Sequence, residues 1–416
     1  MSAPQGPLPG RAAPAPAPAL KRPQIGVGGL RITERARQLV LEVLDSNRLN
    51  AGPMMARFES AIAALHDRRF GLMCNSGTSA LHIALAALKE REGWADGDEV
   101  LVPALTFVAS ANVVLYNRLA PVFVDVDARY YTMDPARIEA RITPRTRAIM
   151  PVHIAGLPCD MGPIMAIARR AGLRVVEDSC EAMFSRDQGR PVGSFGEIAC
   201  FSTYAAHLIT TGVGGVAVTD DPVLRELMSS AMNHGRDPIY TRIDDDQAAE
   251  GADLYRIANS RFSFVRFGHS FRCTEMEAAI GVAQLEDRDE AARRRQAIAA
   301  RLTAGLSGLQ HMLQLPAARP GSEHGYMMYP MTLVDDRIPR AALIEHLETH
   351  GVETRYLLPL INQPIYRATF GNLDDEYPVA ARLNERAFYV GCHPDMRDED
   401  ADEIVAAIHA FVRGRR

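Results

Sequence analysis

Lysine is almost absent from this chain of 416 residues, in which only Lys21 and Lys89 occur. Enzymes that bind a carbonyl cofactor or substrate covalently often use the primary amine of a lysine. The scarcity of lysine therefore excludes this chemistry from every position except these two.

Clustered cysteine, clustered positive charge and long apolar runs are also missing. No secretory segment or apolar run of membrane-spanning length occurs, and the six cysteines are too widely separated for a small disulfide framework. The net charge of −5 and the pI near 6.2 leave no basic surface. We therefore expect a cytoplasmic protein with no nucleic-acid or membrane partner. The cysteines are Cys74, Cys159, Cys180, Cys200, Cys273 and Cys392.

Most of the chain alternates helical patterns with short apolar runs, which is typical of an α/β fold. Residues 1–24 are rich in proline and alanine and are predicted to be a disordered tail. We predict a large domain over residues 25–301 and a smaller C-terminal α/β domain over residues 302–416. The smaller domain would contain a strand at Tyr326–Leu333 and helices at Pro339–His350 and Glu399–Val412. The predicted strands of the large domain are Phe70–Cys74, Val100–Pro103, Pro121–Val124, Ala148–His153, Arg174–Glu177, Ile198–Ser202 and Gly215–Thr219.

A segment rich in small and hydroxyl residues, Asn75–Leu81, follows the first predicted strand and opens a helix. The first amide groups of a helix have no partner within it, and they commonly bind phosphate. Gly77 would let the backbone approach an anion, and the Thr78 hydroxyl would donate a further hydrogen bond. The alternative is an ordinary serine or threonine N-cap.

Two more side chains lie at the ends of predicted strands. Asp178 follows Arg174–Glu177, at the sheet edge where ligands of open α/β sheets collect. A carboxylate there would keep a pyridine nitrogen protonated, so that the ring accepts electrons. Phe107 follows another strand and would stack on such a ring. The alternatives are that Asp178 caps the next helix and that Phe107 packs in the core.

Together these segments resemble the DegT/DnrJ/EryC1/StrS family of sugar aminotransferases and dehydratases. The resemblance implies the fold-type I fold of pyridoxal-phosphate enzymes, with a large three-layer domain around a seven-stranded, mostly parallel sheet. It also implies a homodimer with shared active sites. The segments that carry it span most of the chain and are Asn50–Gly52, Phe58–Glu59, Asn75–Leu81, Val152–Gly156, Glu177–Asp178, Phe201–Ser202, Gly214–Gly215, Gly268–Arg272 with Thr274, and Gly351–Arg355.

The resemblance implies pyridoxal 5′-phosphate or pyridoxamine 5′-phosphate as the cofactor. Its phosphate would be held by Gly77, Thr78 and Ser202. Phe107 would stack on the ring, and Asp178 would pair with the ring nitrogen.

Three positions in this cofactor site depart from the family pattern. Glu181 stands where the family usually has glutamine or histidine, and Val213 replaces a glutamate. Ser270 replaces an asparagine that in the family reaches the phosphate of the partner subunit. These departures leave open a substrate different from those of other members.

The aminotransferases of this family have a lysine at the position of His207. Imidazole has no primary amine, but its ordinary pKa of about 6.5 suits proton transfer. Lys89 does not replace the missing amine, since it lies roughly 16 Å beyond Thr78 along a helix with a rise of about 1.5 Å per residue. Lys21 lies in the predicted tail. We predict that His207 is an acid/base catalyst; the alternative is a structural histidine in an inactive homologue.

Lysine-free members of the family resemble 3-dehydratases, which use pyridoxamine phosphate to remove the C3 hydroxyl of nucleotide-linked 4-keto-6-deoxyhexoses. We predict this reaction, with a nucleotide sugar as substrate and L-glutamate as amino donor. Two alternatives remain open. One is an aminotransferase-like enzyme that works without a lysine, and the other is a non-catalytic protein that binds the cofactor or a sugar.

One branch of these dehydratases carries a two-iron two-sulfur cluster. Its first cysteine follows the aspartate that pairs with the ring nitrogen, and a Cys-x-Cys pair follows much later. Cys180 matches the first position, but the segment His234–Tyr240, where the pair would fall, contains no cysteine. We therefore predict no cluster and no other bound metal.

Overall fold

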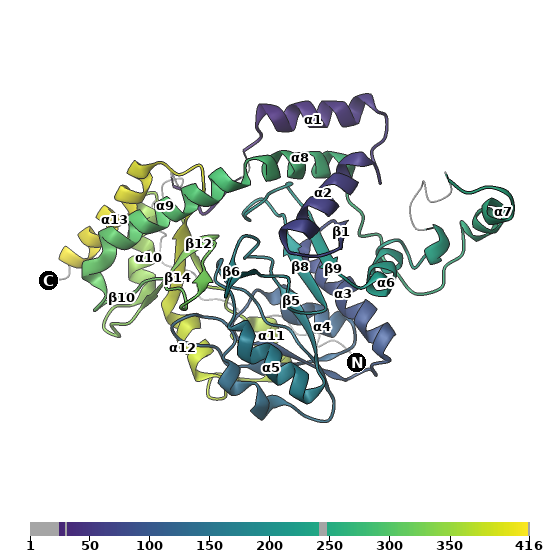
Figure 1. Ribbon diagram of the computed structural model, residues 1–416. Helices are drawn as coiled ribbons and strands as arrows, with labels where there is room; N and C mark the ends of the chain where they lie inside the picture. The colour runs from purple at the N-terminus through teal and green to yellow at the C-terminus, as the bar shows by residue number, and fades with distance from the viewer. Residues whose placement is uncertain (1–24, 30, 241–247, 415–416) are drawn as a thin grey trace, which may run out of the picture.

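The computed structural model describes residues 25–29, 31–240 and 248–414. These residues build a large sheet with helices on both faces and a smaller sheet formed by the C-terminal part of the chain (Figure 1). The predicted tail, with Lys21, lies outside the described residues.

The large sheet has seven strands among the described residues, in the order β1-β9-β8-β5-β4-β2-β3. Strand β9 runs antiparallel to its neighbours β1 and β8, and the other neighbouring pairs are parallel. This confirms the predicted mostly parallel sheet. The strands are β1 (Phe70–Cys74), β2 (Glu99–Pro103), β3 (Ala120–Val124), β4 (Thr146–Ile149), β5 (Arg174–Asp178), β8 (Ile198–Ser202) and β9 (Gly215–Thr219).

One predicted strand, Ala148–His153, extends too far. Strand β4 ends at Ile149, and beyond it only Val152 pairs with the sheet, through an isolated bridge to Asp178. Val152 lines a cavity described below. The regular ladder ends here because Pro151 has no N–H to donate, although the apolar run itself continues.

Alternate residues of the strands point to opposite layers of helices, as the two-residue period of a strand requires. Val176 packs with helices α3 (Gly77–Glu92), α4 (Val108–Tyr116) and α6 (Pro222–Met232) on one face. Its neighbour Val175 packs with α5 (Met161–Ala171), and Phe201 packs with α2 (Pro53–Leu65) and α8 (Glu275–Glu286), on the other face. Helix α1 (Glu34–Asp45) covers α8 from outside (Figure 1). The result is the predicted three-layer arrangement.

The smaller sheet is antiparallel and has the order β10-β12-β14-β13. Helix α9 runs without a break through residue 301, where the boundary between two domains was predicted, and its C-terminal half packs on this sheet. The division into two domains therefore stays a prediction. The strands are β10 (Leu313–Gln314), β12 (Met328–Leu333), β13 (Thr354–Tyr356) and β14 (Ala387–Gly391), and the helices of this part are α9 (Arg288–Leu306), α10 (Arg340–Thr349), α11 (Pro364–Phe370), α12 (Pro378–Arg386) and α13 (Asp398–Arg413).

Two smaller features complete the described chain. Strands β6 (Arg186–Asp187), β7 (Arg190–Pro191) and β11 (Ser322–Glu323) form a short three-stranded sheet. Helix α7 (Gly251–Ser260) projects away from the rest of the molecule (Figure 1).

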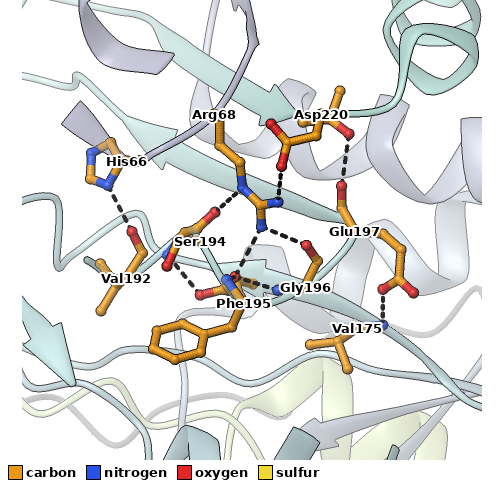
Figure 2. Close-up of polar contacts among 12 residues, drawn as sticks. His66, Arg68, Val175, Val192, Ser194, Phe195, Gly196, Glu197 and Asp220 are labelled. Carbon is orange, nitrogen blue, oxygen red and sulfur yellow. Dashed lines mark hydrogen bonds and ion pairs between the residues drawn. The ribbon is translucent and has the colours of Figure 1, made fainter. Parts of the chain in front are cut away.

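A buried arginine ties the loop before β8 to the end of β9. Arg68 donates from Nε to the carbonyl oxygen of Gly193 at 2.7 Å and from Nη2 to that of Gly196 at 2.5 Å. Its Nη1 donates to the Asp220 carboxylate at 2.9 Å, so the guanidinium lies between this loop and Asp220 (Figure 2). These contacts fix the loop in place because each donor meets a matched acceptor.

The same loop satisfies a carboxylate that is fully buried in the sheet. Glu177 accepts hydrogen bonds of 2.7 Å from the backbone amides of Gly193, Phe195 and Gly196, and His153 Nε2 lies 3.2 Å from its Oε2. Burial disfavours the carboxylate, but these hydrogen bonds outweigh that effect and lower the pKa of Glu177. Glu177 therefore has a structural role, whereas the next residue on β5 faces a cavity.

Candidate cofactor and catalytic site

A cavity of about 420 Å³ lies where β5 and β8 end and where α3 and α4 begin. Residues near the smaller sheet, including Met327 and Tyr389, close another side of it. Sequence reasoning missed these residues. The cavity brings together seven of the predicted site residues, Gly77, Thr78, Phe107, Asp178, Glu181, Ser202 and His207.

One wall of the cavity is the N-terminus of α3. The Ser76 hydroxyl caps this helix by accepting from the Ser79 amide at 3.0 Å, so Thr78 is not needed as a cap and lines the cavity instead. A Cβ atom on Gly77 would lie 2.9 Å from the Cβ of Ser202, so only glycine lets the helix start this close to β8. Helix amides and two hydroxyls thus converge on a place suited to a phosphate.

Asp178 lies at the carboxyl end of β5, on the cavity wall. Its Oδ2 accepts from the Ser110 hydroxyl at 2.7 Å, and Ser110 is 2.9 Å from the hydroxyl of Thr106. Its Oδ1 also accepts from the amide of Cys180 at 3.2 Å, within a turn. In the described chain no helix begins between β5 and β6, so the alternative that Asp178 caps the next helix is wrong. Burial nevertheless raises the pKa of Asp178. A protonated pyridine nitrogen would supply the positive charge that this buried carboxylate needs.

Sequence reasoning missed the two hydroxyls behind Asp178. The only signal was that Thr106 and Ser110 lie four residues apart on either side of the start of α4, where their hydroxyls meet. Phe107 lies between them in sequence, and 57% of it is exposed. The alternative that Phe107 packs in the core is therefore wrong, and its ring is available for stacking.

Glu181 is a second buried acid on the cavity wall. Its Oε2 accepts from the Ala155 amide at 2.8 Å, but burial outweighs this bond and raises the pKa of Glu181 to about 7. The side chain therefore changes charge near neutral pH. The neutral form can donate a hydrogen bond, as the amide of a glutamine at this position would.

Replacement of Glu181 by glutamine should make the stability of the cofactor-free protein less dependent on pH. A raised pKa means that the folded state binds the proton more tightly, so folding loses stability as the pH rises from about 4.5 to about 7. Over this window the free energy of unfolding of the Glu181→Gln protein should gain about 3 kcal/mol relative to wild type. Urea unfolding at several pH values measures this gain. A constant difference between the two proteins would contradict the raised pKa.

His207 lies on a loop that follows β8, and its ring lines the cavity. Burial, together with the nearby Arg295 guanidinium, lowers the pKa of His207 to about 4. The imidazole is therefore neutral at pH 7 and can accept a proton. Its Nδ1 is buried and has no hydrogen-bond partner among the described residues.

No lysine of the described chain lies on the cavity wall. The Lys89 ammonium donates to the Asp96 carboxylate at 2.5 Å and to the Asn117 carbonyl oxygen at 2.8 Å, near the far end of α3. This agrees with the prediction that Lys89 does not serve as the anchor.

Borohydride reduction should therefore leave the wild-type chain without covalently attached cofactor. A His207→Lys variant places an amine on the cavity wall and should gain one cofactor mass after reduction, localised to the peptide with residue 207. Mass spectrometry of the reduced proteins distinguishes the two results. A wild-type adduct at Lys89 or Lys21 would refute the absence of an anchor.

The remaining predicted site residue, Ser270, lies outside this cavity. It is exposed and accepts a hydrogen bond of 3.0 Å from Arg272 Nη2. Its role at the phosphate of a partner subunit stays a prediction.

All six cysteines are free. Within residues 25–29, 31–240 and 248–414, no cluster of three or more His, Cys, Asp or Glu side chains is arranged to hold a metal ion. Over the same part of the chain, no helix is long and apolar enough to cross a membrane.

Comparisons with known proteins agree with this fold. The sequence model described as the DegT/DnrJ/EryC1/StrS aminotransferase family matches residues 30–409. A GDP-perosamine synthase of Caulobacter vibrioides is 34% identical over 389 residues, covering 93% of this chain and 98% of that protein. A dTDP-4-dehydro-2,6-dideoxy-D-glucose 3-dehydratase of Saccharopolyspora spinosa is 33% identical over 396 residues, covering 92% of this chain and 86% of that protein.

A solved structure supports the predicted fold. The GDP-4-keto-6-deoxy-D-mannose-3-dehydratase of E. coli, with bound hydrated PLP, matches with a TM-score of 0.84 at 22% identity, covering 93% of this chain and 100% of that chain. The fold-type I prediction is confirmed.

Proposed function

The chain belongs to the DegT/DnrJ/EryC1/StrS aminotransferase family, and we propose that it is a 3-dehydratase that uses His207 in place of the lysine. It is a sugar-modifying enzyme whose cofactor is pyridoxal 5′-phosphate or pyridoxamine 5′-phosphate. One observation carries the proposal: a neutral, half-buried imidazole stands on the wall of a cavity that otherwise has the groups this cofactor needs.

The residues present fit the cofactor. Gly77, Thr78 and Ser202 would hold its phosphate, Phe107 would cover its ring, and Asp178 would keep its ring nitrogen protonated. Bound pyridoxamine phosphate supplies an amine that condenses with a keto group and a ring that accepts an electron pair. Without a covalent anchor, these contacts alone would retain it.

His207 would move the protons of the reaction. As a neutral base it would take a proton from the carbon next to the cofactor amine, and as an acid it would protonate the departing C3 hydroxyl, which leaves as water. Imidazole cannot release an aminated sugar by amine exchange, as a lysine does. Elimination would therefore be favoured over transamination.

We propose a nucleotide-linked 4-keto-6-deoxyhexose as the substrate, L-glutamate as the amino donor and a homodimer as the assembly. The names of the two relatives, a GDP-perosamine synthase and a 3-dehydratase acting on a dTDP-linked sugar, support a nucleotide sugar. No cluster of cysteines is needed in this proposal, because the two electrons that replace the C3 hydroxyl by hydrogen would come from the amine form of the cofactor, which L-glutamate would restore.

An aminotransferase working without a lysine is the second candidate. The similarity to a GDP-perosamine synthase over nearly the whole chain favours it. A protein that binds the cofactor without catalysis is the third. The site geometry favours the dehydratase over both, because a neutral histidine can move protons but cannot exchange amines.

Product analysis should distinguish these candidates. With pyridoxamine phosphate and a 4-keto-6-deoxy sugar nucleotide, the dehydratase should yield a sugar that lacks the C3 oxygen, detected as a mass loss. An aminotransferase would instead yield a 4-amino sugar. Both reactions would leave the cofactor in its aldehyde form, but only the dehydratase would also release ammonia. A binding protein would yield neither, although the cofactor absorption band would still appear.

A further inference from the structure

A second cavity, of about 440 Å³, also reaches His207. Its walls come from the N-terminal segment near Gly29, the loop from His207 to Thr210, and the region where α8 meets α9. Among the described residues, His207 is the one that lines both this cavity and the cofactor cavity. The imidazole thus forms part of the partition between them.

Within the described chain, three residues that line the second cavity each have an unpaired polar atom. His207 Nδ1, Thr210 Oγ1 and Arg295 Nε are buried and have no hydrogen-bond partner among the described residues. Thr210 and Arg295 are each only 4% exposed, and both line the second cavity. Buried polar atoms in folded proteins are almost always bonded to protein or to ordered water. A cavity of this volume has room for several waters, each needing about 30 Å³.

The charges around the second cavity favour water over an anion. Arg295 is held by carbonyl oxygens, since its Nη1 donates to Cys392 at 2.6 Å and to Met327 at 3.0 Å. Positive and negative side chains are balanced on the walls, so no net charge attracts an ion. The charged wall residues are Arg31, Asp287, Glu290, Arg294, Arg295 and Asp395.

We propose that the second cavity is a water-filled proton route between His207 and bulk solvent, in which Thr210 is a positioning residue for the innermost water. The proposal rests on the proposed role of His207 as acid/base. A histidine that has taken a proton must release it, and cofactor and substrate would exclude solvent from the other cavity. Each transfer moves one proton from the imidazolium to a water while that water passes one on, and no electron pair leaves the ring.

The route can be tested on the imidazole itself, without measuring turnover. The Cε1 hydrogen of each histidine exchanges slowly with deuterium in heavy water, and mass spectrometry of peptides measures it at His207. The protein is loaded with pyridoxamine phosphate, so that the cofactor cavity is filled. Ala291→Trp should block the second cavity, which Ala291 lines. Ala297→Trp is the matched control, because Ala297 is exposed on the same helix and outside that cavity.

Ala291→Trp should slow exchange at His207 several-fold and leave the other histidines unchanged, whereas Ala297→Trp should match wild type. Exchange that Ala291→Trp does not change, but that cofactor loading suppresses, would overturn the route. This result is independent of the product analysis. A blocked exchange without C3 deoxygenation would refute the proposed function and leave the route intact.

The role of Thr210 has its own test, the pH dependence of the same exchange. Thr210→Val removes the hydroxyl but keeps the volume, so the imidazole should lose solvation and its titration midpoint should move to lower pH. Thr210→Ser should restore the midpoint. A midpoint that is equal in all three proteins would refute the positioning role. The titratable groups that line the cofactor cavity together with His207, and Arg295 in the second cavity, are unchanged in these variants. Those of the cofactor cavity are Asp178, Cys180, Glu181, Tyr204 and Tyr389.

Discussion

A His207→Ala variant should lose roughly 10²–10⁴-fold of its rate of C3 deoxygenation, the range that a positioned acid/base group contributes. The methyl side chain can neither accept a proton nor return one to the departing hydroxyl. Binding of pyridoxamine phosphate should persist, because Thr78, Ser202 and Asp178 are unchanged. Single-turnover measurement of the deoxygenated product, beside a fluorescence titration of cofactor binding, checks both expectations.

Chemical rescue sharpens this test. The truncated side chain leaves space on the cavity wall, so free imidazole added to His207→Ala should restore part of the rate, and more strongly at pH values where imidazole is neutral. A His207→Ala variant that turns over at the wild-type rate would refute the acid/base role of His207. Loss of cofactor binding in the variant would instead assign His207 a structural role.

An Asp178→Asn variant should bind the cofactor roughly tenfold to a hundredfold more weakly, since a hydrogen bond to a charged group is worth about 1.5–3 kcal/mol. Turnover should fall further, because an amide does not keep the ring nitrogen protonated. The stability of the cofactor-free protein should not fall. Burial raises the pKa of Asp178, so the carboxylate costs folding free energy at neutral pH and a neutral amide removes that cost.

Glu177→Gln is the matched control for this experiment, because Glu177 precedes Asp178 on the same strand. It accepts from three backbone amides, and its lowered pKa means that its charge stabilises the folded state above the ordinary pKa of a glutamate. The variant should lose about 3 kcal/mol of stability, as when one partner of a buried charge pair is removed. Its cofactor affinity should be unchanged. Urea unfolding and cofactor titration of both variants measure these effects. Equal changes in stability and in cofactor affinity for the two variants would refute a cofactor role for Asp178 and a structural role for Glu177.

The order of the chemical segments was predictable from the sequence because each depends on local pattern. Asn75–Leu81 combines a strand end, a glycine and a helix start within seven residues, and Asp178 ends a buried apolar run. A parallel sheet brings the carboxyl ends of its strands to one edge, so these segments had to meet. Even so, the sequence did not distinguish Ser76 from Thr78 as the helix cap.

The long-range contacts that surround these site residues were not predictable from the sequence. Ser110 binds Asp178 across 68 positions of the chain, and Tyr389 reaches the cavity from a different sheet. Such contacts depend on how layers pack, and no periodicity within a short window records them.

The sequence by itself determined that only Lys21 and Lys89 could supply a primary side-chain amine, because residue identity needs no coordinates, and the family resemblance predicted His207 at the anchor position. Only the tertiary structure decided what that histidine can do. Burial between two cavities lowers its pKa, keeps it neutral at pH 7 and leaves its Nδ1 unpaired. Solvation and neighbouring charge set the protonation of an imidazole, and both arise from residues that folding brings together.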